Sequence, residues 1–78
     1  MLIRSQDKKS LYNLNTNKGL WISNRAKGYT IVAEGLGEIG TYSSESKAIK
    51  VLDMMQARAW SGKQLFIMPT DEEVEDWL

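Results

Sequence analysis

The chain has 78 residues, and ten Lys and Arg balance ten Asp and Glu, so its formal net charge is zero. This length predicts one domain, residues 1–78, and the 42% apolar content is typical of a globular chain. The absence of Cys and His excludes disulfides, thiol nucleophiles, Cys or His metal ligands and His-dependent catalytic triads.

Short strands joined by polar turns are expected over the first 42 residues. Apolar and β-branched residues recur in short runs, of which residues 29–33 are the most strand-like. The loop at 15–19 is rich in Asn and ends in Gly, and such residues tolerate positive φ. The predicted strands are 1–5, 11–14, 20–23, 29–33 and 38–42.

Residues 35–40 (GLGEIG) have the G-x-G-x-x-G spacing of dinucleotide-binding folds. That motif needs a helix opening on its third glycine and a second βα unit afterwards. Here Thr41 and Tyr42 follow the third glycine before any helical pattern begins, and the remaining chain is too short for a second unit. The segment therefore predicts a tight turn with a β-bulge.

A helical period replaces the strand pattern after position 43. Residues 43–46 (SSES) offer hydroxyl N-caps with an acid in the first turn, and Gly62 suits the αL position that ends a helix. One helical stripe carries the apolar side chains of Ala48, Val51, Leu52, Met55 and Ala59. These signals predict a helix over about 44–61, with Lys47 largely on another face.

An apolar strand at about 64–68 is followed by Pro69 and an acidic tail, residues 70–78. Residues 70–73 (TDEE) match a capping box, which predicts a short terminal helix. Val74, Trp77 and Leu78 would share one face of that helix. Three roles remain open for the tail: a solvated helix, a dimer contact through these three residues, or a mimic of nucleic-acid charge.

The order of elements predicts an α+β fold. We expect a small antiparallel sheet of four to six strands, with one main helix across one face and a short C-terminal helix. The predicted core consists of Ile3, Leu14, Ile22, Ile31, Val32, Val51, Leu52, Met55 and Phe66.

The zero net charge conceals a strong asymmetry along the chain. Residues 1–33 carry six basic side chains and one acidic one, residues 34–63 are balanced, and residues 64–78 carry five acidic side chains alone. The asymmetry is consistent with solvated faces or with charge balance inside the molecule. A sharper hypothesis is that residues 1–33, the basic front, contact an anionic partner and that the acidic tail contacts a basic one.

Basic residues lie near aromatic ones in the first half of the chain. An exposed aromatic ring can stack on a nucleotide while Arg or Lys holds the phosphate. The candidate anion contacts are Arg4, Lys18, Arg25, Lys27 and Trp21. The alternative is that the aromatic residues pack in the core or in hairpins, and the sequence lacks the aromatic motifs of RNA-binding sheets.

No pair of acidic residues stands out as catalytic, so we expect no enzyme activity, no catalytic residues, no metal site and no cofactor. No apolar run approaches the ~18 residues that cross a membrane. The start of the chain turns polar after three residues, unlike a secretory signal. We therefore expect a protein of the cytoplasm with no membrane partner.

Four segments together resemble a family of small uncharacterised proteins of phages and prophages of Gram-positive bacteria. They are residues 1–8 (MLIRSQDK), 40–43 (GTYS), 47–56 (KAIKVLDMMQ) and 66–69 (FIMP). The resemblance covers about half of the chain and leaves out residues 15–38. It implies a phage accessory protein in the cytoplasm of the bacterial host, and it transfers no site residues.

These observations favour a binding protein that contacts a host or phage protein and associates with itself as a homodimer. The alternative is a binder of a small anionic ligand, such as a nucleotide signal of host defence. Nucleic-acid binding is a further alternative, weakened by a pI of about 6.2.

Overall fold

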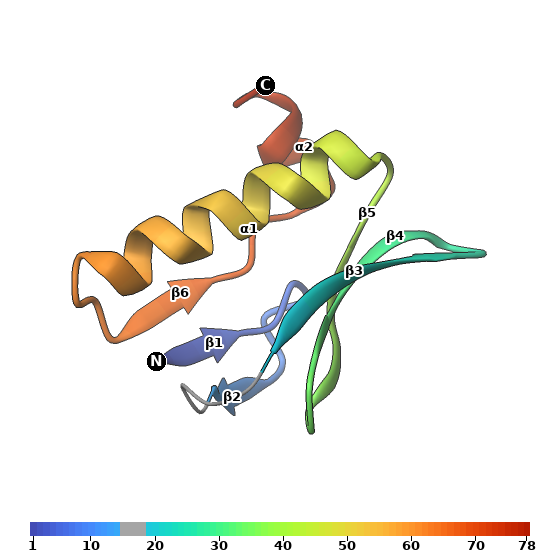
Figure 1. Ribbon diagram of the computed structural model, residues 1–78. Coiled ribbons are helices and arrows are strands. Elements are labelled where there is room, and N and C mark those ends of the chain that lie inside the picture. The colour runs from blue at the N-terminus through green and yellow to red at the C-terminus, as the bar shows by residue number, and fades with distance from the viewer. Residues whose placement is uncertain (15–18) are drawn as a thin grey trace.

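The computed structural model describes residues 1–14 and 19–78, and within them it has the predicted α+β architecture. Six strands and two helices are arranged as shown in Figure 1. In chain order they are β1 (Leu2–Arg4), β2 (Leu11–Asn13), β3 (Leu20–Arg25), β4 (Gly28–Ala33), β5 (Gly37–Tyr42), α1 (Glu45–Trp60), β6 (Leu65–Ile67) and α2 (Asp71–Glu75). Most of the predicted loop 15–19 lies outside the described residues.

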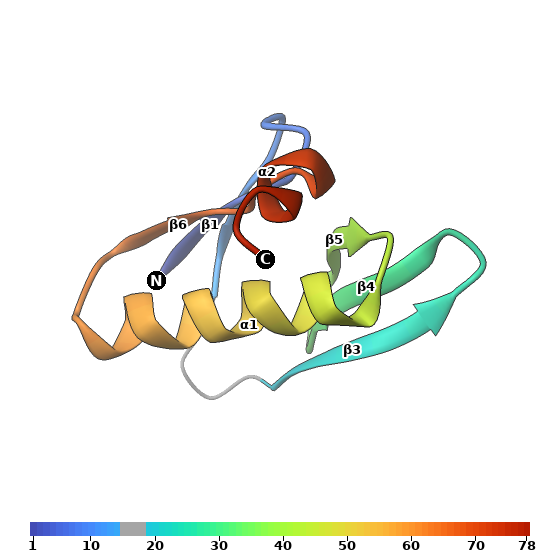
Figure 2. The ribbon, with the colours of Figure 1, turned by 90° about the horizontal axis from the view of Figure 1, so that it is seen from above.

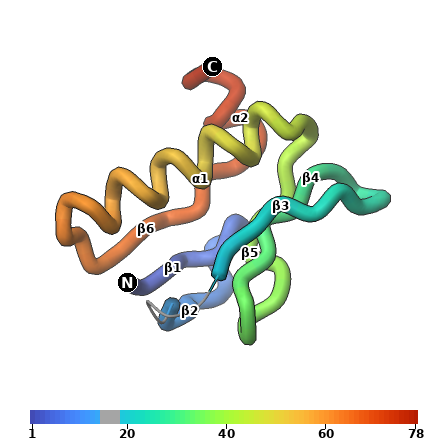
Figure 3. Tube along the Cα trace, viewed as in Figure 1, coloured from blue at the N-terminus to red at the C-terminus, as the bar shows by residue number. Residues whose placement is uncertain are grey.

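The strands form two sheets, which differs from the single antiparallel sheet expected from the sequence. Sheet A has the order β2-β1-β6, and sheet B has the order β3-β4-β5. In sheet A, β1 and β6 run parallel, with Ile3 opposite Phe66. Figure 3 shows these segments from opposite ends of the chain side by side. Pairing at this sequence separation depends on packing both strands against one core, which no local pattern encodes.

The helix α1 lies alongside both sheets, as Figure 2 shows. The residues that cap its two ends match the prediction. Ser44 is the N-cap, and its hydroxyl accepts from the N–H of Lys47 at 3.3 Å. Ser61 is the C-cap, and Gly62 follows with φ of 75°. The observed helix, Glu45–Trp60, is one residue shorter at each end than predicted.

The core lies where α1 meets the inner faces of both sheets. Of the predicted core residues, Ile22 and Leu52 are only partly buried, and Val32 is buried outside the main cluster. Three residues that we did not place in the core, Tyr42, Met68 and Val74, are at most 1% exposed. The core cluster consists of Ile3, Leu14, Ile31, Ala33, Ile39, Tyr42, Ala48, Val51, Met55, Phe66, Met68 and Val74.

The glycine-rich segment forms the predicted turn and bulge. Gly35 and Gly37 have φ of 82° and 88°, which side chains other than glycine rarely adopt. The register between β4 and β5 then shifts, so that Ile39 is an additional residue in β5. No dinucleotide-binding βα unit forms there, because the segment leads from one strand into the next.

The acidic tail forms a shorter helix than predicted. The capping box is present: the Thr70 hydroxyl accepts from the N–H of Glu73, and the Glu73 carboxylate accepts from the N–H of Thr70. The helix α2 ends at Glu75, so Trp77 and Leu78 lie beyond it. Within residues 1–14 and 19–78, no helix is long and apolar enough to cross a membrane.

Candidate functional site

The outer face of sheet A carries a group of exposed aliphatic side chains. Because side chains alternate along a strand, Ile3 and Phe66 point into the core while their neighbours point outward. The register places Leu2 between Asn13 and Leu65 in one row, and Arg4 between Leu11 and Ile67 in the next. The outer face of sheet A is defined here by these six residues.

Four of these six side chains are aliphatic and substantially exposed to solvent. Leu2 is 38% exposed, Leu65 is 43%, Ile67 is 51% and Leu11 is 52%. Single exposed aliphatic residues are ordinary, but adjacent ones on one sheet face are typical of a binding surface. This surface was not predicted from the sequence. Its signal was the lack of polar alternation in residues 1–3 (MLI) and 65–68 (LFIM).

Arg4 is the one charged residue among the six and lies on the central strand of the sheet. Its Nη1 donates a hydrogen bond to the carbonyl oxygen of Lys8 at 3.1 Å. The guanidinium therefore leans toward the β1–β2 turn, and a positive charge lies beside the aliphatic groups. A partner surface must either supply a carboxylate or avoid this charge.

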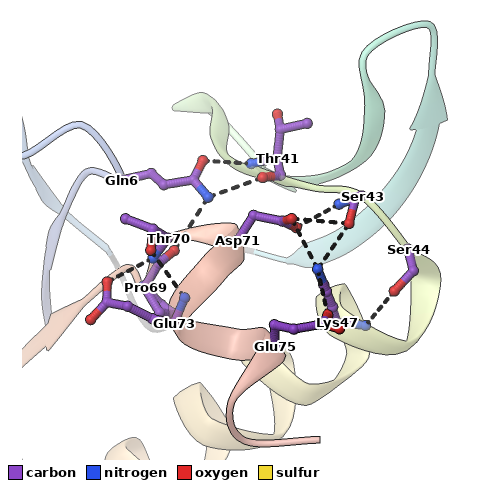
Figure 4. A network of polar contacts seen from close by, with 10 residues as sticks. All are labelled: Gln6, Thr41, Ser43, Ser44, Lys47, Pro69, Thr70, Asp71, Glu73 and Glu75. Atoms are coloured by element: carbon purple, nitrogen blue, oxygen red, sulfur yellow. Dashed lines mark hydrogen bonds and ion pairs between the residues drawn. The ribbon is translucent and has the colours of Figure 1, made fainter.

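A second feature is the polar network that attaches α2 to α1, which Figure 4 shows from close by. Lys47 was expected on a solvent-facing side of α1, but it is only 7% exposed. Its Nζ lies 2.9 Å from Asp71 Oδ2 and 2.8 Å from Glu75 Oε2. The N–H of Ser43 donates to Asp71 Oδ1 at 2.8 Å. Lys47 is thus enclosed by two acids from the tail.

The pKa values of three groups in this network are shifted further away from neutral pH. The backbone N–H of Ser43, followed by Lys47, lowers the pKa of Asp71. Hydrogen bonds to Glu75 and Asp71 raise the pKa of Lys47. Burial, with the negative charge of Asp71 nearby, raises the pKa of Tyr42. These groups keep their usual charges at pH 7, and the network stabilises the fold rather than exchanging protons.

Gln6 joins the two sheets through its side chain, as Figure 4 shows. Its Oε1 accepts from the N–H of Thr41 at 3.0 Å, and its Nε2 donates to the carbonyl oxygen of Thr41 at 3.0 Å. The same Nε2 donates to the carbonyl oxygen of Pro69 at 3.2 Å. The amide therefore takes the place that a neighbouring strand would occupy along β5.

An open groove of about 490 Å³ lies between the β1–β2 turn, β5 and the start of α2. Its lining includes the carboxylates of Asp7, Glu38, Asp71 and Glu72. Three of these already have partners: Asp7 accepts from Ser5, Glu38 pairs with Arg25, and Asp71 pairs with Lys47. The groove is acidic, and two of its four carboxylates, those of Glu38 and Asp71, are paired with basic side chains of the same chain.

The structure places three of the candidate anion contacts, Trp21, Arg25 and Lys27, on the β3–β4 hairpin and separates them from Arg4. Arg4 lies on sheet A, whereas Trp21 and Arg25 lie on β3 of sheet B. The Arg25 guanidinium is 2.6 Å from the Glu38 carboxylate. Lys27 lies in the turn between β3 and β4, and Lys18 lies outside the described residues.

The three residues proposed for a tail interface have different surroundings. Val74 is fully buried in the core of its own chain, so it is not available to a partner. Trp77 is 43% exposed and Leu78 is 64% exposed. Trp60, at the end of α1, is 92% exposed and had not been singled out.

No family model matches this chain, and the searches found no similar curated protein and no similar solved structure.

Proposed function

We propose that the protein acts by binding rather than by catalysis, and that its first partner is a second copy of the same chain. The observation that supports this function is the outer face of sheet A. Four aliphatic side chains there, Leu2, Leu11, Leu65 and Ile67, are 38–52% exposed. A contact that brings side chains of this face against those of a second copy would remove part of this apolar surface from water, which is the main driving force of protein association.

The size of sheet A supports a second copy as the occupant. Each of its three strands has only three residues, which is at the short end for strands in globular proteins. The chain also has no disulfide to stabilise so small a fold. A contact that extends or covers this sheet would stabilise its weakest part.

The biological setting that we propose is that of a phage accessory protein in the cytoplasm of a bacterial host. Its support is the sequence resemblance of residues 1–8, 40–43, 47–56 and 66–69 to small phage proteins. The alternative of a small anionic ligand gains no support from the placement of the basic residues. Arg4 lies on a different sheet from Arg25 and Lys27, and Arg25 is already paired with Glu38.

Sedimentation velocity tests the self-association. The chain should change from monomer to dimer between about 1 μM and about 1 mM, the range expected for a small interface. Replacing both Leu2 and Ile67 with Lys should keep it monomeric throughout, because two new charges would have to lose their hydration.

The matched control is Ile49→Lys, since Ile49 is 45% exposed on α1 and the added charge is of the same kind. This variant should associate like the unchanged chain. A chain that stays monomeric at every concentration would contradict the proposed function.

A further inference from the structure

The outer edge of β6 presents backbone groups that sheet A does not use. The carbonyl oxygen of Gln64 accepts from Leu2 at 2.7 Å, and the N–H of Met68 donates to Arg4 at 3.0 Å. Alternate residues of β6 therefore face β1. Backbone groups alternate in direction along a strand, so those of Leu65 and Ile67 point to the opposite side. β6 is a terminal strand of sheet A, and this side is its free edge.

Apart from its length of only three residues, this edge lacks the features that normally prevent strands from pairing. Natural edge strands carry charges, Pro or bulges that block a second chain. Residues 64–68 (QLFIM) contain no charge and no Pro, and their first blocking residue is Pro69. By contrast, β3 carries Arg25 at its end, and Gln6 already covers Thr41 on the edge of β5.

Stacking two outer faces against each other is less favourable because of Arg4. Arg4 lies on the central strand, between Leu11 and Ile67. A two-fold axis through the centre of that face would bring two guanidinium groups together, and like charges repel at short range. Pairing along the β6 edge keeps the two Arg4 residues apart and brings Leu65 and Ile67 of one copy beside those of the other.

The charges at the two ends of β6 favour an antiparallel pair. Lys63 precedes the strand, and the acidic first turn of α2, with Asp71, Glu72 and Glu73, follows it. In an antiparallel pair, the end with Lys63 lies beside the acidic end of the other copy. A parallel pair would place like charges together at both ends.

From these observations we infer that two copies dimerise by antiparallel pairing of their β6 strands, forming one continuous six-stranded sheet. The inference rests on the proposed self-association and specifies its geometry. With the two-fold axis at Phe66, Leu65 lies opposite Ile67 of the partner subunit. Each such pair exchanges two N–H···O bonds, because all four residues have free groups on that edge. Their side chains also become neighbours on the outer face.

Amide hydrogen exchange measured by NMR tests this geometry in the unchanged protein. The N–H groups of Leu65 and Ile67 should exchange fast in dilute samples and slow down as the dimer fraction rises. The N–H of Met68 donates to Arg4 within one chain, so it is the internal reference and should stay protected at every concentration.

A backbone substitution gives an independent test. Leu65→Pro removes an outward N–H and leaves in place the hydrogen bonds that Gln64 and Met68 make with β1, and edge strands tolerate Pro. It should weaken dimerisation at least tenfold. If this variant unfolds, Ile67→Lys replaces it, because a charge on an edge strand opposes pairing. Leu11→Lys, on β2 of the same face, should weaken dimerisation far less.

The outcomes separate the geometry from the proposed function. Dimerisation without slower exchange at Leu65 and Ile67 would overturn the β6 pairing and leave self-association standing. So would loss of the dimer in Trp77→Lys together with full dimerisation in Leu65→Pro, which would assign the contact to the tail. A chain that is monomeric at all concentrations would overturn both.

Discussion

At the scale of single residues, Lys47 shows how this small core accommodates a charge. The helical pattern places Lys47 largely on another face than the apolar stripe, but the structure buries it, and two carboxylates from the tail surround its ammonium group. A buried ammonium without partners would be strongly unfavourable. Asp71 is the more constrained of the two acids, since it also accepts hydrogen bonds from the backbone and hydroxyl of Ser43.

Replacing Asp71 with Asn should lower the stability of the folded chain at neutral pH. It should also make that stability depend less on pH in the acidic range. In the folded chain, the N–H of Ser43 and the charge of Lys47 lower the pKa of Asp71 from its usual 3.8. The stabilisation is therefore present above about pH 4 and is lost as the pH falls through the lowered value. Because Asp71 is partly exposed, we expect a loss of roughly 0.5–1 kcal/mol at pH 7.

Thermal unfolding followed by circular dichroism between about pH 2 and pH 7 measures this effect. The two melting temperatures should converge at the acidic end of the range. Asp53→Asn, at an exposed position of α1, controls for the loss of one negative charge. Equal melting temperatures of the Asp71 variant and the unchanged chain at pH 7 would contradict the role given to this carboxylate.

At the scale of elements, Gln6 holds the two sheets in place relative to each other. One side chain from the β1–β2 turn bonds to both backbone groups of Thr41 on β5 and to the carbonyl of Pro69 before α2. The contact uses two donated and one accepted hydrogen bond, which only an amide side chain of this length supplies. Sheets A and B are therefore joined by a side chain here, not by a strand ladder.

Gln6→Glu tests this contact with almost no change of shape. A carboxylate at this position cannot donate to the carbonyls of Thr41 and Pro69, so we expect a loss of about 2 kcal/mol at pH 7. The neutral acid donates one bond, so folding should raise the pKa of the new Glu. Its relative stability should be highest below the unfolded pKa of about 4.3 and decrease as the pH rises through the folded value.

Urea unfolding at several pH values measures the difference from the unchanged chain. Gln56→Glu is the control, since Gln56 is exposed on α1 and the same charge is introduced. If both variants lose the same stability, the three hydrogen bonds of Gln6 contribute nothing specific.

At the scale of the whole molecule, part of the charge asymmetry along the chain is compensated within the fold. The acidic tail returns to α1, where Asp71 and Glu75 pair with Lys47. Hydrogen bonds with the backbone and the hydroxyl of Thr70 lower the pKa of Glu73, and the positive charge of Lys8, from the basic front, lowers it further. Charge balance inside the molecule, one of the interpretations of the asymmetry, therefore accounts for part of the negative charge of the tail. Val74 anchors the same segment in the core.

Two substitutions in the tail should separate its structural part from its exposed part. Val74→Ala removes buried methyl groups and should cost about 2 kcal/mol of unfolding free energy. Trp77→Ala, at a half-exposed position, should change that free energy by less than ~0.5 kcal/mol. Urea unfolding at a concentration where the protein is monomeric measures both. Equal effects would show that α2 is not anchored through Val74.

Elements that depend on near neighbours in the sequence were predicted well. The limits of α1, the capping box at Thr70 and the turn with positive φ at Gly35 and Gly37 follow from signals a few residues long. The single sheet and the exposed position of Lys47 were predicted incorrectly, and Val74, predicted as part of an interface, is buried in the core. Each of these depends on which distant segment packs against the residue concerned.

The amino-acid sequence by itself determined the class of the fold and excluded the chemistry of His and Cys, because periodicity, capping and composition are local properties. Only the tertiary structure decided that β1 pairs with β6 and that Gln6 bridges the sheets. It also decided that aliphatic side chains from both ends of the chain gather on one face around Arg4. Burial and strand pairing result from long-range packing. The inner face of a short apolar strand packs against the core, and its outer face is left to solvent or to a partner.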